Sequence, residues 1–473
     1  MIDTNTIKDR ILSFAYQGRL VESNKLSNDA IEAIQESIKG YIPVSEEEYL
    51  IDIPKEWKWT RLGYVTSNHG QITPSEAFSY IDVGTLDNVN HRLSSHENIV
   101  EAKDAPSRAK KVVETGDVIY STVRPYLHNI CIIDKDFPCT PIASTAFCVM
   151  HANEEILDNK YLFYWLLTKE FDKYSNGDPS KGALYPAIGE KDLLRGVIPL
   201  PAISEQKAIV EKIEAVFEIL DKINVLQNQY DSNQEALKSK LIDAAIQGKL
   251  TEQVSEGGSA ADLLRKLSEG RTELVKQGEI RKKKVLPALS QTEYPFDIPH
   301  NWEWVYVSDI WAIINGDRGK NYPAKSTLSH TGIPFISALN LDGATVVADE
   351  KLLCLSDEQY EKLGSGKLKK GDVVVCIRGS IGKHGKYPFD RGAIASSLII
   401  ARNYLQNELI NDYLMIYLDS QLFRDEIKKY NGGSAQPNLA AESLEKFRIP
   451  LPPVEEQEKI VNRVRKLLKT IAE

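Results

Sequence analysis

The sequence has few of the features that mark membrane, secreted or disulfide-rich proteins. No apolar run approaches the roughly 18 residues that a membrane-spanning helix needs. The first residues, Met1 to Thr4, lack a basic region followed by an apolar one, so we see no secretory signal. The five cysteines are odd in number and form no Cys-x-x-Cys pair, which indicates reduced thiols and not a disulfide framework. We therefore expect a cytoplasmic protein.

Motifs for catalysis and cofactor binding are also lacking. No Gly-x-Gly-x-x-Gly follows a predicted strand and no Asn-Pro-Pro-Tyr-like tetrapeptide is present, so neither pocket of a DNA methyltransferase is evident. The run Gly379–Lys383 has part of a phosphate-loop pattern, but its spacing is short and His384 stands where Ser or Thr should bind the metal. The eight histidines show no His-x-x-x-His spacing. The sequence thus predicts no catalytic residue, no metal site and no cofactor in this chain.

The composition is that of a globular protein with several domains. The 473 residues are 42% hydrophobic and 26% charged, which is ordinary for a chain with buried cores. The formal net charge of −9 argues against a protein that binds polyanions indiscriminately. It leaves sequence-specific DNA binding open, because the field at a groove depends on one face of the molecule and not on its total charge.

A heptad pattern dominates residues 204–246. Apolar residues recur in steps of three and four, at Ile209, Ile213, Val216, Leu220, Ile223, Tyr230, Leu237, Leu241 and Ala244. Gln227 and Gln234 occupy the two positions where an apolar residue is missing, which should cost stability but could fix register and partner. The pattern predicts a coiled-coil helix, roughly 50 Å long at ~1.5 Å per residue. A long amphipathic core helix is the alternative.

The same helix recurs in two pieces at the chain ends. Its first part, starting at Pro199, recurs from Pro450, 251 positions later, with the seam residues Ile460, Val464, Leu467 and Ile471. Its later part, starting at Leu237, recurs 230 positions earlier, with Ile7, Ile11 and Phe14. Two half-helices that together replace one whole helix predict antiparallel helical segments, a pseudo-two-fold axis and chain termini that lie close together.

Each half of the chain also contains one copy of the same domain. The segment Glu48–Trp59 recurs as Glu293–Trp304, with two tryptophans that we expect in the core of a first strand. Gly116–Tyr120 recurs as Gly371–Val375, a turn followed by a buried strand. We predict two homologous α/β (α+β) domains separated by a long antiparallel coiled coil. The expected boundaries are 1–45 for the N-terminal helix and linker, 46–200 for the first domain, 201–252 for the central helix, 253–292 for a linker, 293–452 for the second domain and 453–473 for the C-terminal helix.

The loops that differ between the two copies carry side chains suited to DNA. Arginine can bond guanine bidentately, asparagine and glutamine can bond adenine, and glycine lets the backbone approach phosphate. Each residue taken singly is also typical of an ordinary polar turn, and only recurrence at matched places favours a binding role. The candidates are Arg108, Lys110, Lys111, Arg124, Tyr126, His128, Lys181 and Tyr185 in the first domain, and Arg318, Arg378, Ser380, Lys383, His384, Lys386, Gln436 and Asn438 in the second.

These motifs, in this order and twice over, resemble the specificity subunit of type I restriction–modification systems over essentially the whole chain. The most specific pieces are Ile298–Trp304, the Arg-Gly-Ser-Ile-Gly run at 378–382, Gln436-Pro437-Asn438, and Pro-Leu-Pro followed by Glu-Gln in both halves. The first half departs from this pattern, with Val123-Arg124-Pro125 near the Arg-Gly-Ser position and Tyr185-Pro186-Ala187 near the Gln-Pro-Asn position. Which loop of the first domain reads bases therefore stays open.

The resemblance implies two target-recognition domains that each read one half of a bipartite double-stranded DNA site. It implies helices that set the spacer and dock two modification (methyltransferase) subunits, to which restriction (endonuclease/translocase) subunits are added. It implies no catalysis by this chain, with S-adenosylmethionine on the modification subunit and ATP and Mg on the restriction subunit. Two other classes remain as alternatives: a self-sufficient methyltransferase or nuclease, which the missing motifs oppose, and a scaffold that binds proteins and not DNA.

Overall fold

The computed structural model describes residues 1–22, 36, 38–94, 98–177, 187–252, 258–347, 352–430 and 438–472. They form two compact units, Met1–Gln229 and Tyr230–Glu473. The spacing of Ala30, Ile31 and Ile34 also predicts a short helix within 26–42, and most of that segment lies outside the described residues. Among the helices of the described ranges, none has the length and apolar character to cross a membrane.

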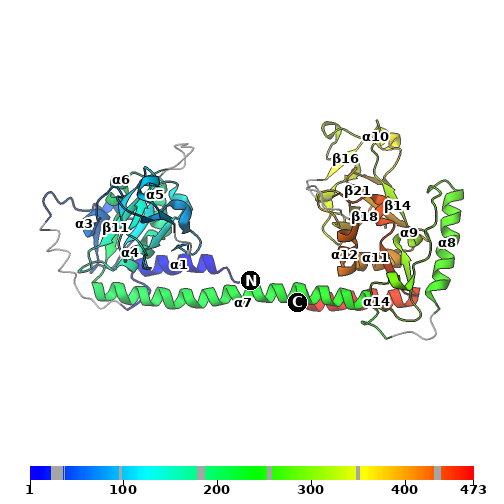
Figure 1. The fold of residues 1–473 in the computed structure, drawn as a ribbon, viewed down its shortest axis with the longest axis horizontal. Coiled ribbons are helices and arrows are strands. Elements are labelled where there is room, and N and C mark those ends of the chain that lie inside the picture. The colour runs from blue at the N-terminus through cyan, green and yellow to red at the C-terminus, as the bar shows by residue number, and fades with distance from the viewer. Residues whose placement is uncertain are drawn as a thin grey trace. The chain divides into compact units, whose positions relative to one another are not determined.

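One helix of 44 residues, α7 (Ile203–Ile246), runs from the first unit into the second, which confirms the predicted long helix (Figure 1). In the first unit α1 (Thr4–Tyr16) lies along it. Thr4 Oγ1 donates to Asn224 Oδ1 at 2.6 Å and Lys8 Nζ contacts Asp221 Oδ1 at 2.5 Å. Numbering rises along α1 while it falls along α7, so the two helices are antiparallel. In the second unit α14 (Val454–Ala472) lies along the last part of α7.

The residues in the first part of the predicted seam are buried or half-buried, and near the end of α7 the buried positions are shifted by one residue. Ile209, Ile213, Leu220, Ile460 and Val464 are buried, and Val216, Ile223, Leu467 and Ile471 are half-buried. Tyr230 and Leu237 are 59% and 52% exposed, so their expected burial is wrong for this chain.

Near the end of α7 the buried residues are Ile242, Ala245 and Ile246, one position beyond the predicted Leu241 and Ala244, which are half-buried. The N-terminal helix repeats this shift, with Leu12, Ala15 and Tyr16 buried and Ile7, Ile11 and Phe14 half-buried. These helix ends pack on a globular core as well as on a second helix, and the core-facing side becomes the most buried one.

The two seam glutamines each bind one terminal segment. In the first unit, Gln227 Nε2 donates to the Ile2 carbonyl at 3.2 Å and Gln227 Oε1 accepts from the Ile2 N–H at 2.6 Å. In the second unit, Gln234 Nε2 donates to the Ile471 carbonyl at 2.9 Å and to the Tyr230 hydroxyl at 2.6 Å. An apolar residue could not make these bonds, so both glutamines set the register of a terminal helix against α7.

Two four-stranded sheets form the body of the first unit. One has the order β6-β3-β10-β7, from β6 (Ile99–Val100), β3 (Phe78–Ile81), β10 (Pro141–Ser144) and β7 (Ala109–Val112), with β3 and β10 parallel. The other has the order β2-β11-β8-β9, from β2 (Thr66–Ser67), β11 (Phe147–Ala152), β8 (Val118–Ser121) and β9 (Ile130–Ile132), all antiparallel. Smaller sheets pair β1 (Lys58–Arg61) with β12 (Val197–Leu200) and β4 (Leu86–Asp87) with β5 (Arg92–Leu93).

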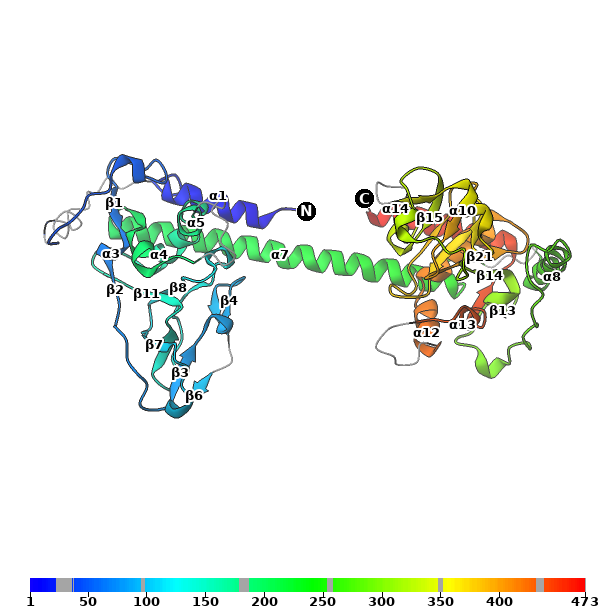
Figure 2. The same ribbon diagram turned by 90° about the horizontal axis from the view of Figure 1, so that it is seen from above.

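Among the described residues, the second unit has the same sheets apart from the β4–β5 pair. Figure 2 shows the helices and strands of each unit from above. A two-stranded sheet pairs β13 (Glu303–Tyr306) with β22 (Arg448–Leu451). One four-stranded sheet has the order β14 (Trp311–Asn315), β21 (Leu398–Asn403), β18 (Val373–Cys376) and β19 (His384–Lys386). The other has the order β16 (Leu353–Leu355), β15 (Ile333–Ile336), β20 (Gly392–Ile394) and β17 (Lys367–Leu368). Two helices follow β11 and β21: α4 (Asn159–Leu166) and α5 (Lys169–Asn176) in the first unit, and α11 (Glu408–Asp419) and α12 (Gln421–Tyr430) in the second. The second unit also contains α8 (Ala260–Lys276), which lies within the segment 253–292 that was predicted to be a linker. The mixed α/β class is confirmed.

The recurring motifs build the junction between each domain and its helix. The tryptophans Trp57, Trp59, Trp302 and Trp304 are all buried, as predicted. Gly18 follows α1 at φ +67°, and a Cβ there would come within 2.3 Å of Pro54 Cγ. Gly248 follows α7 at φ +69°, with Pro299 Cγ at 2.5 Å. The positive φ ends α1 at Tyr16 and lets the chain pass directly over the proline.

Candidate nucleic-acid interface

One hairpin loop occupies the same place in both units. β8 pairs with β9 so that Tyr120 faces Ile130, and β18 pairs with β19 so that Val375 faces His384. The enclosed loops are residues 122–129 and 377–383, eight and seven residues long. These are the two loops that the sequence singled out after the buried strands.

Both loops turn through left-handed backbone conformations at matched positions. In the second unit the residues are glycines, Gly379 at φ +76° and Gly382 at φ +88°. Three residues beyond β8 the first unit has Arg124 at φ +52°, and two residues before β9 it has His128 at φ +50°. A non-glycine residue in this conformation costs roughly 1–2 kcal/mol. At these two left-handed positions the first unit therefore carries a guanidinium, from Arg124, and an imidazole, from His128. Backbone strain of this kind is concentrated at functional sites.

Contacts from the body of the unit hold the first loop in place. His128 Nε2 lies 2.6 Å from Asp172 Oδ1 on α5, and Asn88 Nδ2 donates to the Leu127 carbonyl at 2.7 Å. Burial lowers the pKa of the nearby His91 imidazole, and the neighbouring His128 acts in the same direction. The loop is therefore a supported turn whose outward-facing residue, Tyr126, is 51% exposed.

A second turn lies beside the hairpin loop in each unit. In the first, the N–H groups of Thr122 and Thr145 donate to the carbonyls of Ala146 and Arg108, at 2.8 Å each. In the second, the Ile377 N–H donates to the Ser397 carbonyl at 2.9 Å.

Arg318 joins this turn of the second unit, since its Nη2 donates to the Ser396 carbonyl at 3.2 Å. The structure thus brings Arg108 beside the loop of Arg124, and Arg318 beside the loop of Arg378.

A third element completes the cluster. Ala187, shortly before α6 (Glu190–Arg195), forms a β-bridge with Val123. Asn438, shortly before α13 (Ala441–Leu444), forms a β-bridge with Arg378. In the second unit Arg378 Nε also donates to Asn438 Oδ1 at 3.1 Å. In each unit, the residue that forms this bridge therefore lies beside the hairpin loop. We name the hairpin loop, the adjacent turn and this bridge together the loop cluster.

The predicted binding residues divide into exposed and tied groups. Arg108, Lys110, Arg124, Tyr126, Arg318, Arg378, Ser380 and Asn438 are exposed. His128 is half-buried and bonded to Asp172, and four others also use their polar atoms inside the unit. For these five the expectation of a DNA-facing side chain is corrected. Lys111 is buried, with Nζ 2.5 Å from Glu190 Oε2, and His384 on β19 is 4% exposed. Lys383 Nζ donates a hydrogen bond to the Ala338 carbonyl. Lys386 Nζ donates to the carboxylates of Glu408 and Asp412. Lys181, Tyr185 and Gln436 lie outside the described residues.

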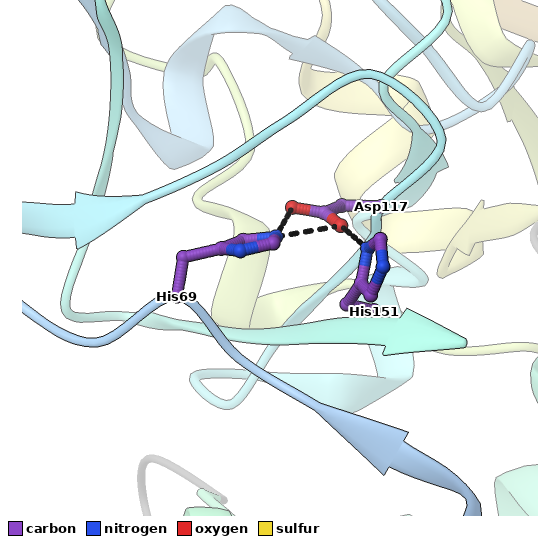
Figure 3. A group of neighbouring side chains, drawn as sticks. All are labelled: His69, Asp117 and His151. Carbon is purple, nitrogen blue, oxygen red and sulfur yellow. Dashed lines mark hydrogen bonds and ion pairs between the residues drawn. The ribbon is translucent and has the colours of Figure 1, made fainter. Parts of the chain in front are cut away.

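Sequence reasoning missed one cluster in the first unit, formed by His69, Asp117 and His151 (Figure 3). One ligand atom from each residue lies within 4.8 Å of the others. The three are 48 and 34 positions apart, a spacing that carries no local signal. Only a comparison of Asp117 with Asp372, its counterpart in the second copy, could have drawn attention to it.

Two copies of one mixed α/β domain, each with a basic loop cluster and joined through a shared helix, define a tandem recognition protein. A model of the type I restriction modification DNA specificity domain matches residues 54–229 and 299–473. The chain belongs to this family.

Individual proteins with similar sequences are also specificity subunits of type I restriction enzymes. The chain is 23% identical to the type I restriction enzyme EcoAI specificity subunit of Escherichia coli, over 98% of this chain and 89% of the relative. It is 27% identical to the EcoDI specificity subunit of Escherichia coli over 55% and 59% of the two chains.

Solved structures give the same fold. One is a chain from a study of complex assembly and conformational transition of the type I R-M system, with a TM-score of 0.65 and 25% identity over 89% of this chain and 92% of that one. Another is the HsdS subunit from Thermoanaerobacter tengcongensis, with a TM-score of 0.51 and 24% identity over 89% and 91%.

Proposed function

We propose that this chain gives a type I restriction–modification complex its DNA sequence specificity, with each unit reading one half of a bipartite site. The observation that carries this proposal is the recurrence of the loop cluster. In both units it places exposed arginines on a hairpin that the body of the domain supports, and the surrounding residues differ between copies. Arginine reads guanine through two parallel hydrogen bonds in the major groove, so two differing clusters suit two different half-sites.

The continuous helix α7 supports a spacing role. Because α7 contributes residues to both units, we propose that its length governs how far apart along DNA the two domains act. We propose that α7, α1 and α14 set the spacer and dock two modification subunits, which restriction subunits join. The exposed apolar side chains of α7, including Ile219, Leu226 and Leu237, suit such docking.

We further propose that this chain performs no catalysis. In this scheme S-adenosylmethionine binds the modification subunit, and ATP and Mg bind the restriction subunit. The complex would act in the cytoplasm, in keeping with five cysteines that are all free thiols. A self-sufficient methyltransferase would instead bind S-adenosylmethionine as the isolated chain, which calorimetry would detect.

The deciding experiment expresses this chain with its cognate modification subunit in a host without DNA methylation and maps methyl-adenine across the genome. We expect a split motif with a fixed unread gap, which disappears when this chain is omitted. A stable complex without methylation and without retardation of any DNA would overturn the proposal in favour of a protein-binding scaffold. A motif with one defined half would show that only one unit reads bases.

A further inference from the structure

A buried aspartate precedes the same strand in both units, but different side chains face it. Asp117 precedes β8 and Asp372 precedes β18, and they are 0% and 3% exposed. In the second unit Arg402 donates to both carboxylate oxygens of Asp372, from Nε at 2.8 Å and from Nη2 at 2.6 Å. A permanently charged guanidinium thus compensates a buried carboxylate.

The first unit replaces this arginine by two imidazoles. His151 is the fifth residue of β11, as Arg402 is the fifth residue of β21, and its Nδ1 lies 2.9 Å from Asp117 Oδ1. The second imidazole comes from a neighbouring segment. β2 of the first unit corresponds to β14 of the second, but β2 ends at Ser67 whereas β14 continues to Asn315. Just beyond the end of β2, His69 turns towards Asp117, with its Nε2 3.1 Å from Asp117 Oδ2. Figure 3 shows both rings directed at the one carboxylate.

The outer side of this cluster is also arranged for a ligand. The second nitrogen of His69, Nδ1, lies 3.6 Å from Glu114 Oε1. Metal-binding histidines commonly donate their other N–H to a carboxylate, which orients the ring and raises its basicity. Asp117 is itself oriented by the Glu114 N–H, which donates to Oδ2 at 2.7 Å. Glu114 therefore supports Asp117 through a backbone hydrogen bond, and its side chain lies within ion-pair distance of His69.

We propose that His69, Asp117 and His151 bind a divalent transition-metal ion of the zinc type, with water in the fourth position. Two imidazoles and one carboxylate are a donor set that zinc accepts, with bonds of about 2.0–2.2 Å. Tetrahedral geometry at such bond lengths separates donor atoms by about 3.3 Å. The donors here lie within 4.8 Å, so binding needs only small side-chain adjustments.

The position of the site indicates a structural role. β8 runs from Asp117 towards its hairpin loop, and β11 pairs antiparallel with it so that His151 lies at the end away from that loop. A bound ion would join β8, β11 and the segment after β2 at the end of the sheet remote from the loop cluster. We therefore expect the metal to stabilise the first unit and to leave the recognised DNA sequence unchanged, so this proposal stands or falls independently of the proposed function.

The test is a metal titration of the chelator-treated full chain with Zn²⁺, followed by calorimetry and by thermal unfolding. We expect one equivalent to bind and the unfolding midpoint to rise, with Co²⁺ giving the visible absorption of a tetrahedral site. His151→Arg copies the second unit, so it should abolish binding while leaving the midpoint of the metal-free protein close to that of the parent. Glu114→Gln should weaken Zn²⁺ binding about 10–100-fold.

Two control variants distinguish Zn²⁺ binding at this site from nonspecific Zn²⁺ binding by other cysteine and histidine side chains. Cys139→Ser removes a half-exposed thiol and His330→Gln removes an exposed histidine of the second unit, and neither should change the stoichiometry. The proposal is overturned if the parent chain binds no Zn²⁺ at micromolar concentration, which would mean that the imidazoles only hydrogen-bond Asp117. It is equally overturned if one equivalent still binds to both His69→Gln and His151→Arg.

Discussion

The side chain of Gln227 forms two hydrogen bonds with the backbone of Ile2: it accepts one from the Ile2 N–H and donates one to the Ile2 carbonyl. The residue that interrupts the heptad pattern is therefore the one that fixes where α1 begins against α7. We expect Gln227→Leu to restore the apolar pattern and yet to loosen the N-terminal segment. Each lost bond costs up to about 1 kcal/mol, less at this exposed position.

Hydrogen exchange of the α1 amides measures this loosening. Protection at the start of α1 should fall in Gln227→Leu and persist in Gln229→Leu, which makes the same change at an exposed glutamine nearby on α7. Equal protection in both variants would show that packing alone fixes α1.

Lengthening α7 tests its spacing role. Seven residues inserted between Gln227 and Gln234 keep both glutamine contacts and nearly preserve the helical phase, while adding about 10 Å. At ~3.4 Å per base pair, we expect methyl-adenine mapping to show a spacer about three base pairs longer and unchanged half-sites. A two-residue insertion, which rotates the later part of α7 by about 200°, should abolish methylation. Altered half-site sequences in the seven-residue variant would contradict the role of α7 as a spacer.

The loop cluster predicts which arginine matters in the second unit. Arg378→Ala should reduce discrimination at one base of the second half-site by about 1–3 kcal/mol and leave the first half-site unaffected. Asn438→Ala removes the acceptor that orients Arg378 and should have a smaller effect in the same direction. Competition binding with single-base variants of the mapped site measures both. Lys266→Ala, an exposed change on α8, is the control and should leave the base preference intact.

Gly18 and Gly40 form a matched pair for testing the contact with Pro54. Both have positive φ, but a Cβ on Gly40 meets nothing within 4 Å, while one on Gly18 meets Pro54 Cγ at 2.3 Å. Alanine at either position carries the left-handed strain of roughly 1–2 kcal/mol. Gly18→Ala should lose an additional 1–3 kcal/mol, about the usual cost of overpacking, in denaturant unfolding. Equal losses would show that the proline simply moves aside.

The Glu48–Arg61 pair predicts a loss of stability in acid. A hydrogen bond from the Arg61 guanidinium is the main reason that the pKa of Glu48 falls from 4.5 to about 2. Because the folded-state pKa is the lower one, the pair stabilises the fold fully above pH 4.5 and loses this contribution as pH falls towards 2.

Glu48→Gln should therefore be less stable than the parent at pH 6, by up to about 1 kcal/mol for this partly exposed pair, and nearly equal to it close to pH 2. Urea unfolding at both pH values measures the difference. A constant difference between the two proteins would exclude the ion pair as its cause.

Internal repetition made the fold predictable. The displacements of 251 and 230 positions identify α14 and α1 as copies of the two parts of α7, and the paired tryptophans mark the first strand of each domain. What repetition could not give was the orientation of each side chain. Lys111 is basic in the sequence, but only the folded chain shows its ammonium turned inward to Glu190. The exposure of Tyr230 and Leu237 was hidden for a similar reason, because a heptad pattern does not say which segments of a helix have a partner.

The left-handed positions of the hairpin loops bear on how specificity can change during evolution. The first unit shows that the left-handed positions near both ends of this loop can carry side chains where the second unit has glycines. A Cβ on Gly379 would meet nothing within 4 Å, so that position has room for a side chain facing outwards. Asparagine or aspartate, which tolerate positive φ better than other residues, would be the least costly substitutions. One substitution could then add a new hydrogen-bonding group to the recognition surface without rebuilding the domain that presents it.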